Sequence, residues 1–118
     1  MQLTNIPFAI ALGITFSFVE LLPAATPKET FGPDVIAEVY KHASSDDLWI
    51  YRFQPENHDP SVDHRPAVVF FFGGGWNGGS VHQFEKHATY LAQRGIVAFL
   101  ADYRVKSRQG VSPDDCVR

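Results

Sequence analysis

The chain has 118 residues, enough for one small domain, and its 45% hydrophobic and 19% charged residues are typical of a globular protein. The formal net charge is -3 and the basic residues are scattered, which excludes a nucleic-acid-binding stripe and a polybasic membrane patch. A single cysteine, Cys116, excludes a disulfide framework and a cysteine-based zinc site within the chain. We expect neither a metal ion nor a cofactor.

The first 25 residues differ in composition from the rest. The stretch from Ile6 to Val19 is apolar, but at 14 residues it is short for a membrane span. Small residues follow at Ala24 and Ala25, so we expect a secretory signal peptide over residues 1–25. The protein would then be secreted or periplasmic, and otherwise cytoplasmic. Because no Lys or Arg precedes the apolar stretch, an uncleaved amphiphilic anchor is the alternative.

A polar connector with Pro and Gly follows at residues 26–33, and the predicted domain covers residues 34–118. Its first part contains two β-rich segments, residues 35–40 and 48–53. The residues between them include "SSDD", which favours a turn. This part of the sequence therefore predicts an antiparallel β-hairpin.

Two later segments, Ala67–Phe72 and residues 96–101, are apolar at every position. Such segments are expected to be buried on both faces, as in the middle of a largely parallel sheet. Residues 83–94 between them have apolar side chains at helical spacing, with Gly95 as the stop. This order predicts an α/β fold with a right-handed crossover. Ser112 is expected to cap one more helix.

The sequence "FFFGGGWNGGS" at residues 70–80 follows the first of these apolar strands. It therefore lies at the carboxyl end of a strand, where open α/β sheets bind their ligands. Glycines let main-chain N–H groups turn toward a ligand, and converging N–H groups stabilise negative charge. Two ligands commonly need this arrangement: a phosphate, and the oxyanion formed when an acyl group is attacked.

The phosphate interpretation has some support from the pattern. A G-x-G-x-x-G motif is present, formed by Gly73, Gly75 and Gly78, and Asp102 ends the next strand. Two features oppose it: the helix is expected to begin only beyond the glycines, and Trp76 puts a large ring where a pyrophosphate would approach. A dinucleotide-binding domain is therefore kept as an alternative, which a helix beginning at Gly78 would favour.

The glycine stretch and a second motif resemble the α/β-hydrolase esterases, above all the branch of acetyl-esterase and hormone-sensitive-lipase-like enzymes with their carbohydrate-esterase relatives. That family carries H-G-G-G-[WF] after its third strand and D-Y-R after its fourth. Here residues 72–76 read "FGGGW" and residues 102–104 read "DYR", at matching spacing. The resemblance covers about residues 35–118. It implies the amino-terminal part of an α/β-hydrolase fold, with an incomplete sheet.

The resemblance also implies roles for residues. It assigns an oxyanion hole to the main-chain N–H groups of Gly74 and Gly75, and a supporting role to Gly73, Trp76, Asp102, Tyr103 and Arg104. Trp76 would shape the acyl or alcohol pocket. Asp102, Tyr103 and Arg104 would brace the glycine loop through hydrogen bonds. The family's loop-bracing His is Phe72 here.

The catalytic triad of the family is not found in the 118 residues. No serine lies in G-x-S-x-G, and Ser80 is expected to cap a helix instead. We therefore expect a part of a serine carboxylic-ester hydrolase, truncated before the nucleophile and inactive alone. The intact enzyme would act on small acyl or carbohydrate esters. A non-catalytic remnant or binding module is the second alternative. The apolar strands, with one helix to cover them, also predict poor solubility.

Overall fold

The computed structural model of the chain describes residues 25–43 and 46–118. The predicted signal peptide, residues 1–25, lies outside these described residues except for its last one. Across the two described ranges, no helix is both long enough and apolar enough to pass through a membrane.

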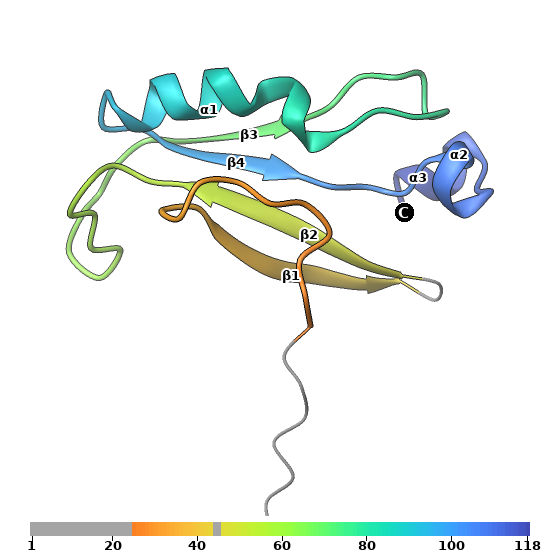
Figure 1. Ribbon diagram of the computed structural model, residues 1–118, viewed down its shortest axis with the longest axis horizontal. Helices are drawn as coiled ribbons and strands as arrows, with labels where there is room; N and C mark the ends of the chain where they lie inside the picture. The colour runs from red at the N-terminus through yellow and green to blue at the C-terminus, as the bar shows by residue number, and fades with distance from the viewer. Residues whose placement is uncertain (1–24, 44–45) are drawn as a thin grey trace, which may run out of the picture.

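The described residues form one four-stranded mixed sheet in the order β1-β2-β4-β3 (Figure 1). Its strands are β1 (Ile36–Ala43), β2 (Asp46–Phe53), β3 (Ala67–Phe71) and β4 (Val97–Ala101). β1 and β2 pair antiparallel, which confirms the predicted hairpin. β3 and β4 pair in parallel, which confirms the predicted strand–helix–strand unit. β4 also pairs with β2, in antiparallel orientation, and so lies between β2 and β3 in the sheet.

The crossover from β3 to β4 consists of the 3₁₀ turn η1 (Val81–Phe84) and the helix α1 (Glu85–Ala92). Gly95, at φ +85°, ends this helical segment as predicted, because its N–H and that of Ile96 bond back to carbonyls of the last turn. Two four-residue helices follow β4, α2 (Lys106–Gln109) and α3 (Pro113–Cys116). Ser112 caps α3, as expected, in a reciprocal capping box with Asp115.

One face of the sheet is covered by α1 (Figure 1). The helix is amphipathic and presents its small residues Ala88 and Ala92 to the sheet, so that the two layers approach closely. They pack in a core that includes Tyr51 and Leu100, each about 1% exposed. Phe70 of β3 stacks on Phe84 of η1 with ring centroids 5.0 Å apart, so β3 is packed against the same helical layer.

The opposite face is open in the described part of the chain. Val69 and Phe71 of β3 are 47% and 62% exposed, whereas β4 is buried or nearly so throughout. The prediction of burial on both faces is thus right for β4 and wrong for β3. β4 lies between two strands, but β3 is an edge strand, and no described element packs on its outer face.

Candidate active site

The glycine loop, residues 72–80, leaves the carboxyl end of β3 at the end of the sheet where α2 and α3 also lie (Figure 1). Its tip is a tight turn in which the N–H of Asn77 donates to the carbonyl of Gly74 over 3.1 Å. The two central residues, Gly75 and Trp76, have φ values of +58° and +59°, as in a type I′ turn. A left-handed Trp costs about 1–2 kcal/mol, so backbone strain is concentrated here.

Steric contact also requires glycine at Gly74, where φ is +156°. A Cβ atom there would lie 1.9 Å from the carbonyl oxygen of Gly78. The backbone of Gly74 therefore lies directly against the backbone of Gly78 across the loop, and there is no space for a side chain at residue 74.

The main-chain N–H groups of the loop are used unequally. The N–H of Gly73 donates to Oε1 of Gln83 over 2.6 Å. The N–H groups of Gly74 and Gly75 donate to no acceptor among the described residues. The N–H of Trp76 has no acceptor in the described chain either, so three adjacent donors are available to a ligand, and all three belong to residues that line a pocket.

This pocket has a volume of about 630 Å³ and lies between the glycine loop, the sheet and the C-terminal helices. Its walls are largely apolar, formed by Leu48, Phe71, Phe72, Trp76 and Val117. Trp76 is half exposed and projects from the tip of the turn. A group bound at the free amides would therefore have an apolar environment beside it.

Tyr103 supports the base of the loop. Its hydroxyl donates to the carbonyl of Phe72 over 2.6 Å, and the two rings stack with centroids 4.2 Å apart. Burial raises the pKa of the Tyr103 hydroxyl, so the donor proton is retained at neutral pH. Phe72, where the family has a bracing His, thus acts through its ring and its carbonyl.

The tip of the loop is held by the segment after β4. The N–H groups of Lys106 and Ser107, in the first turn of α2, donate to the carbonyls of Trp76 and Asn77 over 2.9 and 2.8 Å. The loop is therefore held at its base, by Tyr103, and at its tip, by Lys106 and Ser107. The free N–H groups of Gly74 and Gly75 lie between these two points of attachment. Such preorganisation is what makes N–H donors effective in stabilising a developing charge.

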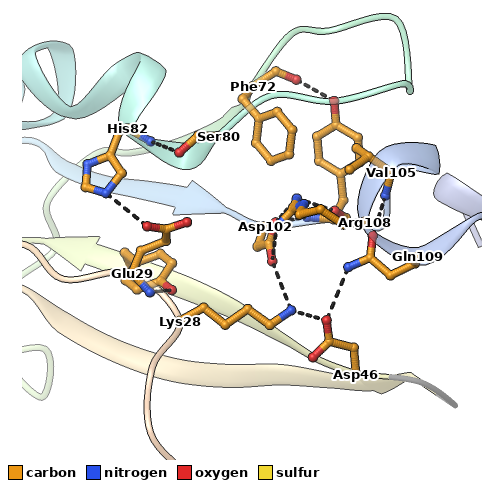
Figure 2. A network of polar contacts seen from close by, with 12 residues as sticks. Lys28, Glu29, Asp46, Phe72, Ser80, His82, Asp102, Val105, Arg108 and Gln109 are labelled. Carbon is orange, nitrogen blue, oxygen red and sulfur yellow. Dashed lines mark hydrogen bonds and ion pairs between the residues drawn. The ribbon is translucent and has the colours of Figure 1, made fainter.

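The bracing expected of Asp102 and Arg104 needs correction. Asp102 is 4% exposed and accepts from Arg108 over 2.8 Å and from the N–H of Tyr103 over 2.9 Å (Figure 2). Arg104 donates to the carbonyl of Asp115. Within the described chain, neither side chain bonds the glycine loop, because both turn toward the segments that follow β4.

Two side chains that contact the base of the glycine loop, Arg108 and Gln83, were not predicted from the sequence. Arg108 lies with its guanidinium 5.6 Å from the centre of the Phe72 ring, so it joins Asp102 to the base of the loop. Gln83 holds the N–H of Gly73. Gln83 could have been found as the first polar side chain after the loop that is long enough to reach back. Arg108 lies in no motif.

The start of the helical segment bears on the dinucleotide alternative. Ser80 caps η1 as predicted, its hydroxyl accepting from the N–H of His82 over 3.3 Å. The segment therefore begins at Val81, three residues beyond Gly78, and not at the third glycine, as a pyrophosphate site requires. In the described ranges, no group of three or more His, Cys, Asp or Glu side chains is placed to hold a metal ion.

Comparison with known proteins gives matches among solved structures. No protein-family model and no curated protein matches the chain. Among solved structures, the chain is similar to a thermophilic esterase, Est2, from the Planctomycetes species Thermogutta terrifontis, at 48% sequence identity and a TM-score of 0.68. The match covers 72% of this chain and 30% of the native esterase.

The same esterase has been solved in other states with the same identity and TM-score. The match covers 31% of the propionate-bound chain and 32% of the chain phosphorylated by paraoxon. This protein thus spans about a third of that esterase's length. By sequence identity, by fold and by the two motifs at matching spacing, the chain is similar to part of an α/β-hydrolase esterase.

Proposed function

We propose that residues 72–80 are the oxyanion-hole loop of a serine carboxylic-ester hydrolase that acts on small acyl or carbohydrate esters. The observation that carries this proposal is the pair of adjacent N–H groups, of Gly74 and Gly75, that lack acceptors in the described chain and belong to residues that line a pocket. We further propose that the 118-residue chain does not hydrolyse esters by itself, because it contains no G-x-S-x-G nucleophile motif.

The physical argument follows from how charge develops in ester hydrolysis. Attack by a nucleophile turns the ester carbonyl oxygen into an oxyanion, and donors about 2.7–3.1 Å from that oxygen stabilise it. The loop offers two such donors on a backbone that is already fixed by Tyr103, Lys106 and Ser107. The donors then need no rearrangement during the reaction. The nucleophile, the base and the acid would come from outside this chain.

A chimera tests the proposal directly. Residues 35–118 would replace the matching segment of the Thermogutta terrifontis esterase, and hydrolysis of p-nitrophenyl butyrate would be measured. We expect the chimera to be active and the 118-residue chain to be inactive. A folded but inactive chimera would refute the assignment of the loop. Activity of the chain alone, abolished by a serine-directed phosphonate, would refute its proposed inactivity.

We also propose that the esterase acts outside the cytoplasm, on the basis of the apolar leader that precedes residue 26. Amino-terminal sequencing of protein recovered from the extracytoplasmic fraction should begin near Thr26. Recovery of protein that still starts at Met1, in the cytoplasm, would refute this localisation.

A further inference from the structure

The pocket beside the glycine loop has an unusual balance of charge. Three basic side chains line it, Lys41, Arg104 and Arg118, and no Asp or Glu does. The chain as a whole has 13 acidic and 10 basic residues, so composition alone would favour acidic side chains in the pocket. The concentration of positive charge is a local property of this site.

In the described part of the chain, no Asp or Glu side chain forms a direct ion pair with these three cations. The Asp115 carboxylate is close enough for the charges of Arg104 and Arg118 to lower its pKa, after the larger effect of its hydrogen bonds with Ser112. Lys41 donates to the main-chain oxygen of Arg118, the last residue of the sequence, and Arg104 donates to the main-chain carbonyl of Asp115. The carboxylate of Asp115 bonds the hydroxyl of Ser112 over 2.6 Å instead. Outside the pocket, carboxylate partners are present for Lys28, Arg52, Arg65 and Arg108. Among the described residues, Lys86, Arg94 and Lys106 have none, so what distinguishes the pocket is that its cations lie together.

The surroundings strengthen the effect of this charge. Lys41 and Arg104 are half-buried, and the walls next to them include Leu48 and Phe71. Apolar walls exclude water and lower the local dielectric constant, so an anion beside a guanidinium is attracted more strongly than at an open surface. A guanidinium also presents paired N–H donors that match the two oxygens of a carboxylate.

We propose that this pocket selects esters whose acyl or alcohol part carries a carboxylate. The ester carbonyl would lie at the N–H groups of Gly74 and Gly75, and the carboxylate at Arg104, with Lys41 as the second cation. Arg104 is then a specificity-determining residue rather than a brace for the loop. This inference rests on the proposed function, because it takes the glycine amides as the site of the ester carbonyl.

Binding to the 118-residue chain tests the inference. The probes are monomethyl esters of unbranched dicarboxylic acids, from succinate to suberate, each compared with its dimethyl ester. We expect at least one monomethyl ester to bind about tenfold or more tightly than its dimethyl partner, a preference worth about 1.4 kcal/mol. The preference should weaken as salt is added, since it depends on charge. Equal affinities, or no binding by any monomethyl ester, would overturn the inference.

Variants identify the residue responsible. Arg104→Gln should abolish the preference, with the larger loss of affinity for the monomethyl ester, and Arg104→Lys should keep part of the preference. Arg94→Gln is the matched control, because Arg94 follows α1 and stacks on Tyr90, outside the pocket. If Arg104→Gln impairs folding, Lys41→Gln provides a second test and should reduce the preference severalfold. A preference that survives both Arg104→Gln and Lys41→Gln would contradict the assignment.

Two NMR readouts separate this inference from the proposed function. Shifts of the Gly74 and Gly75 amides report on the oxyanion hole, and the Arg104 side-chain resonances report on the carboxylate. If both ester types move the glycine amides equally and Arg104 is unaffected, the inference fails and the proposed function stands. If monomethyl esters move Arg104 but not the glycine amides, the carboxylate subsite stands and the oxyanion role fails. In the chimera, the same preference should appear in kcat/KM.

Discussion

Tyr103 is the side chain that most directly links the sheet to the candidate oxyanion hole. Its hydroxyl and its ring contact Phe72 by separate interactions, a hydrogen bond and a stacked pair. The two can therefore be tested separately, because removing the hydroxyl leaves the ring in place.

Tyr103→Phe should destabilise the protein by about 1 kcal/mol, since it leaves a part-buried carbonyl without its donor. Amide exchange at Gly73 and Asn77, whose N–H groups are hydrogen-bonded within the loop region, should become about fivefold faster if the Tyr103 bond holds the loop. Tyr90→Phe is the control, because Tyr90 is 54% exposed and its hydroxyl makes no hydrogen bond in the described ranges. Identical melting temperatures and exchange rates for the two variants would show that the Tyr103 hydroxyl does not hold the loop.

Also at the residue scale, the sequence indicated a candidate site but not the contacts that its side chains make. The glycines and "DYR" were identifiable because a motif concerns neighbouring residues. The ion pair between Arg108 and Asp102 forms only when α2 turns back toward the end of β4, and α2 is too short to produce a periodic pattern. The direction in which Arg104 points was unpredictable for the same reason.

The segment before β1 contacts elements that are distant in sequence (Figure 2). The N–H of Glu29 donates to the Tyr51 hydroxyl over 3.1 Å, and its carboxylate lies 3.2 Å from Nε2 of His82. The ring of Phe31 lies 4.4 Å from the His82 ring. Nδ1 of His82 is 2.9 Å from Glu85. His82 thus joins this segment to η1, the element that follows the glycine loop.

This contact makes the stability of the protein depend on pH. The hydrogen bond to Glu85, and after it the charges of Glu29 and Glu85, raise the pKa of His82 above 6.5 in the folded protein. The stabilisation is therefore complete below pH 6.5 and is lost as the pH rises through the folded value. Since the side chain is 38% exposed, solvent screening limits the effect to less than about 1 kcal/mol.

The corresponding prediction concerns His82→Gln. The difference in Tm between the natural protein and this variant should be larger at about pH 6 than at about pH 8.5. His64→Gln is the control, because His64 is exposed and has no ion-pair partner in the described residues. A Tm difference that does not change with pH, or that grows toward high pH, would contradict the role of His82.

Among the elements, sequence reasoning succeeded where the signal is local. The hairpin, α1 with its glycine stop, the Ser80 cap and the Ser112 cap each depend on a few adjacent residues. The segment over Glu29 and Phe31 appeared only as a polar connector. Its partners lie up to 53 positions away, and no local pattern indicates them.

For the molecule as a whole, the uncovered face of the sheet is the main structural consequence of the edge position of β3. Val69 and Phe71 expose large apolar surfaces side by side on that face, next to an unpaired strand edge in the described chain. Exposed apolar patches and open strand edges both favour association between molecules. The strand's apolar sequence predicted burial, but burial depends on what covers the strand.

The chain should therefore associate in solution at low concentration, and Val69→Lys should raise the concentration at which light scattering first detects association. Val62→Lys adds the same charge at a 67% exposed loop position away from the sheet, so it should have little effect. If both variants change association equally, net charge rather than the open face would be responsible.

The central claim is that the amides of the glycine loop stabilise an oxyanion. The most direct test of it is the kcat of the esterase chimera that carries Gly74→Ala. A Cβ at this position would collide with the carbonyl of Gly78 and displace the neighbouring N–H groups, whereas a Cβ at Gly78 would meet only the hydroxyl of Ser107 at 3.3 Å. With p-nitrophenyl butyrate, Gly74→Ala should lower kcat by about 10²–10³ with little change in KM, and Gly78→Ala by only a few-fold. An unchanged kcat in a folded Gly74→Ala chimera would contradict the claim.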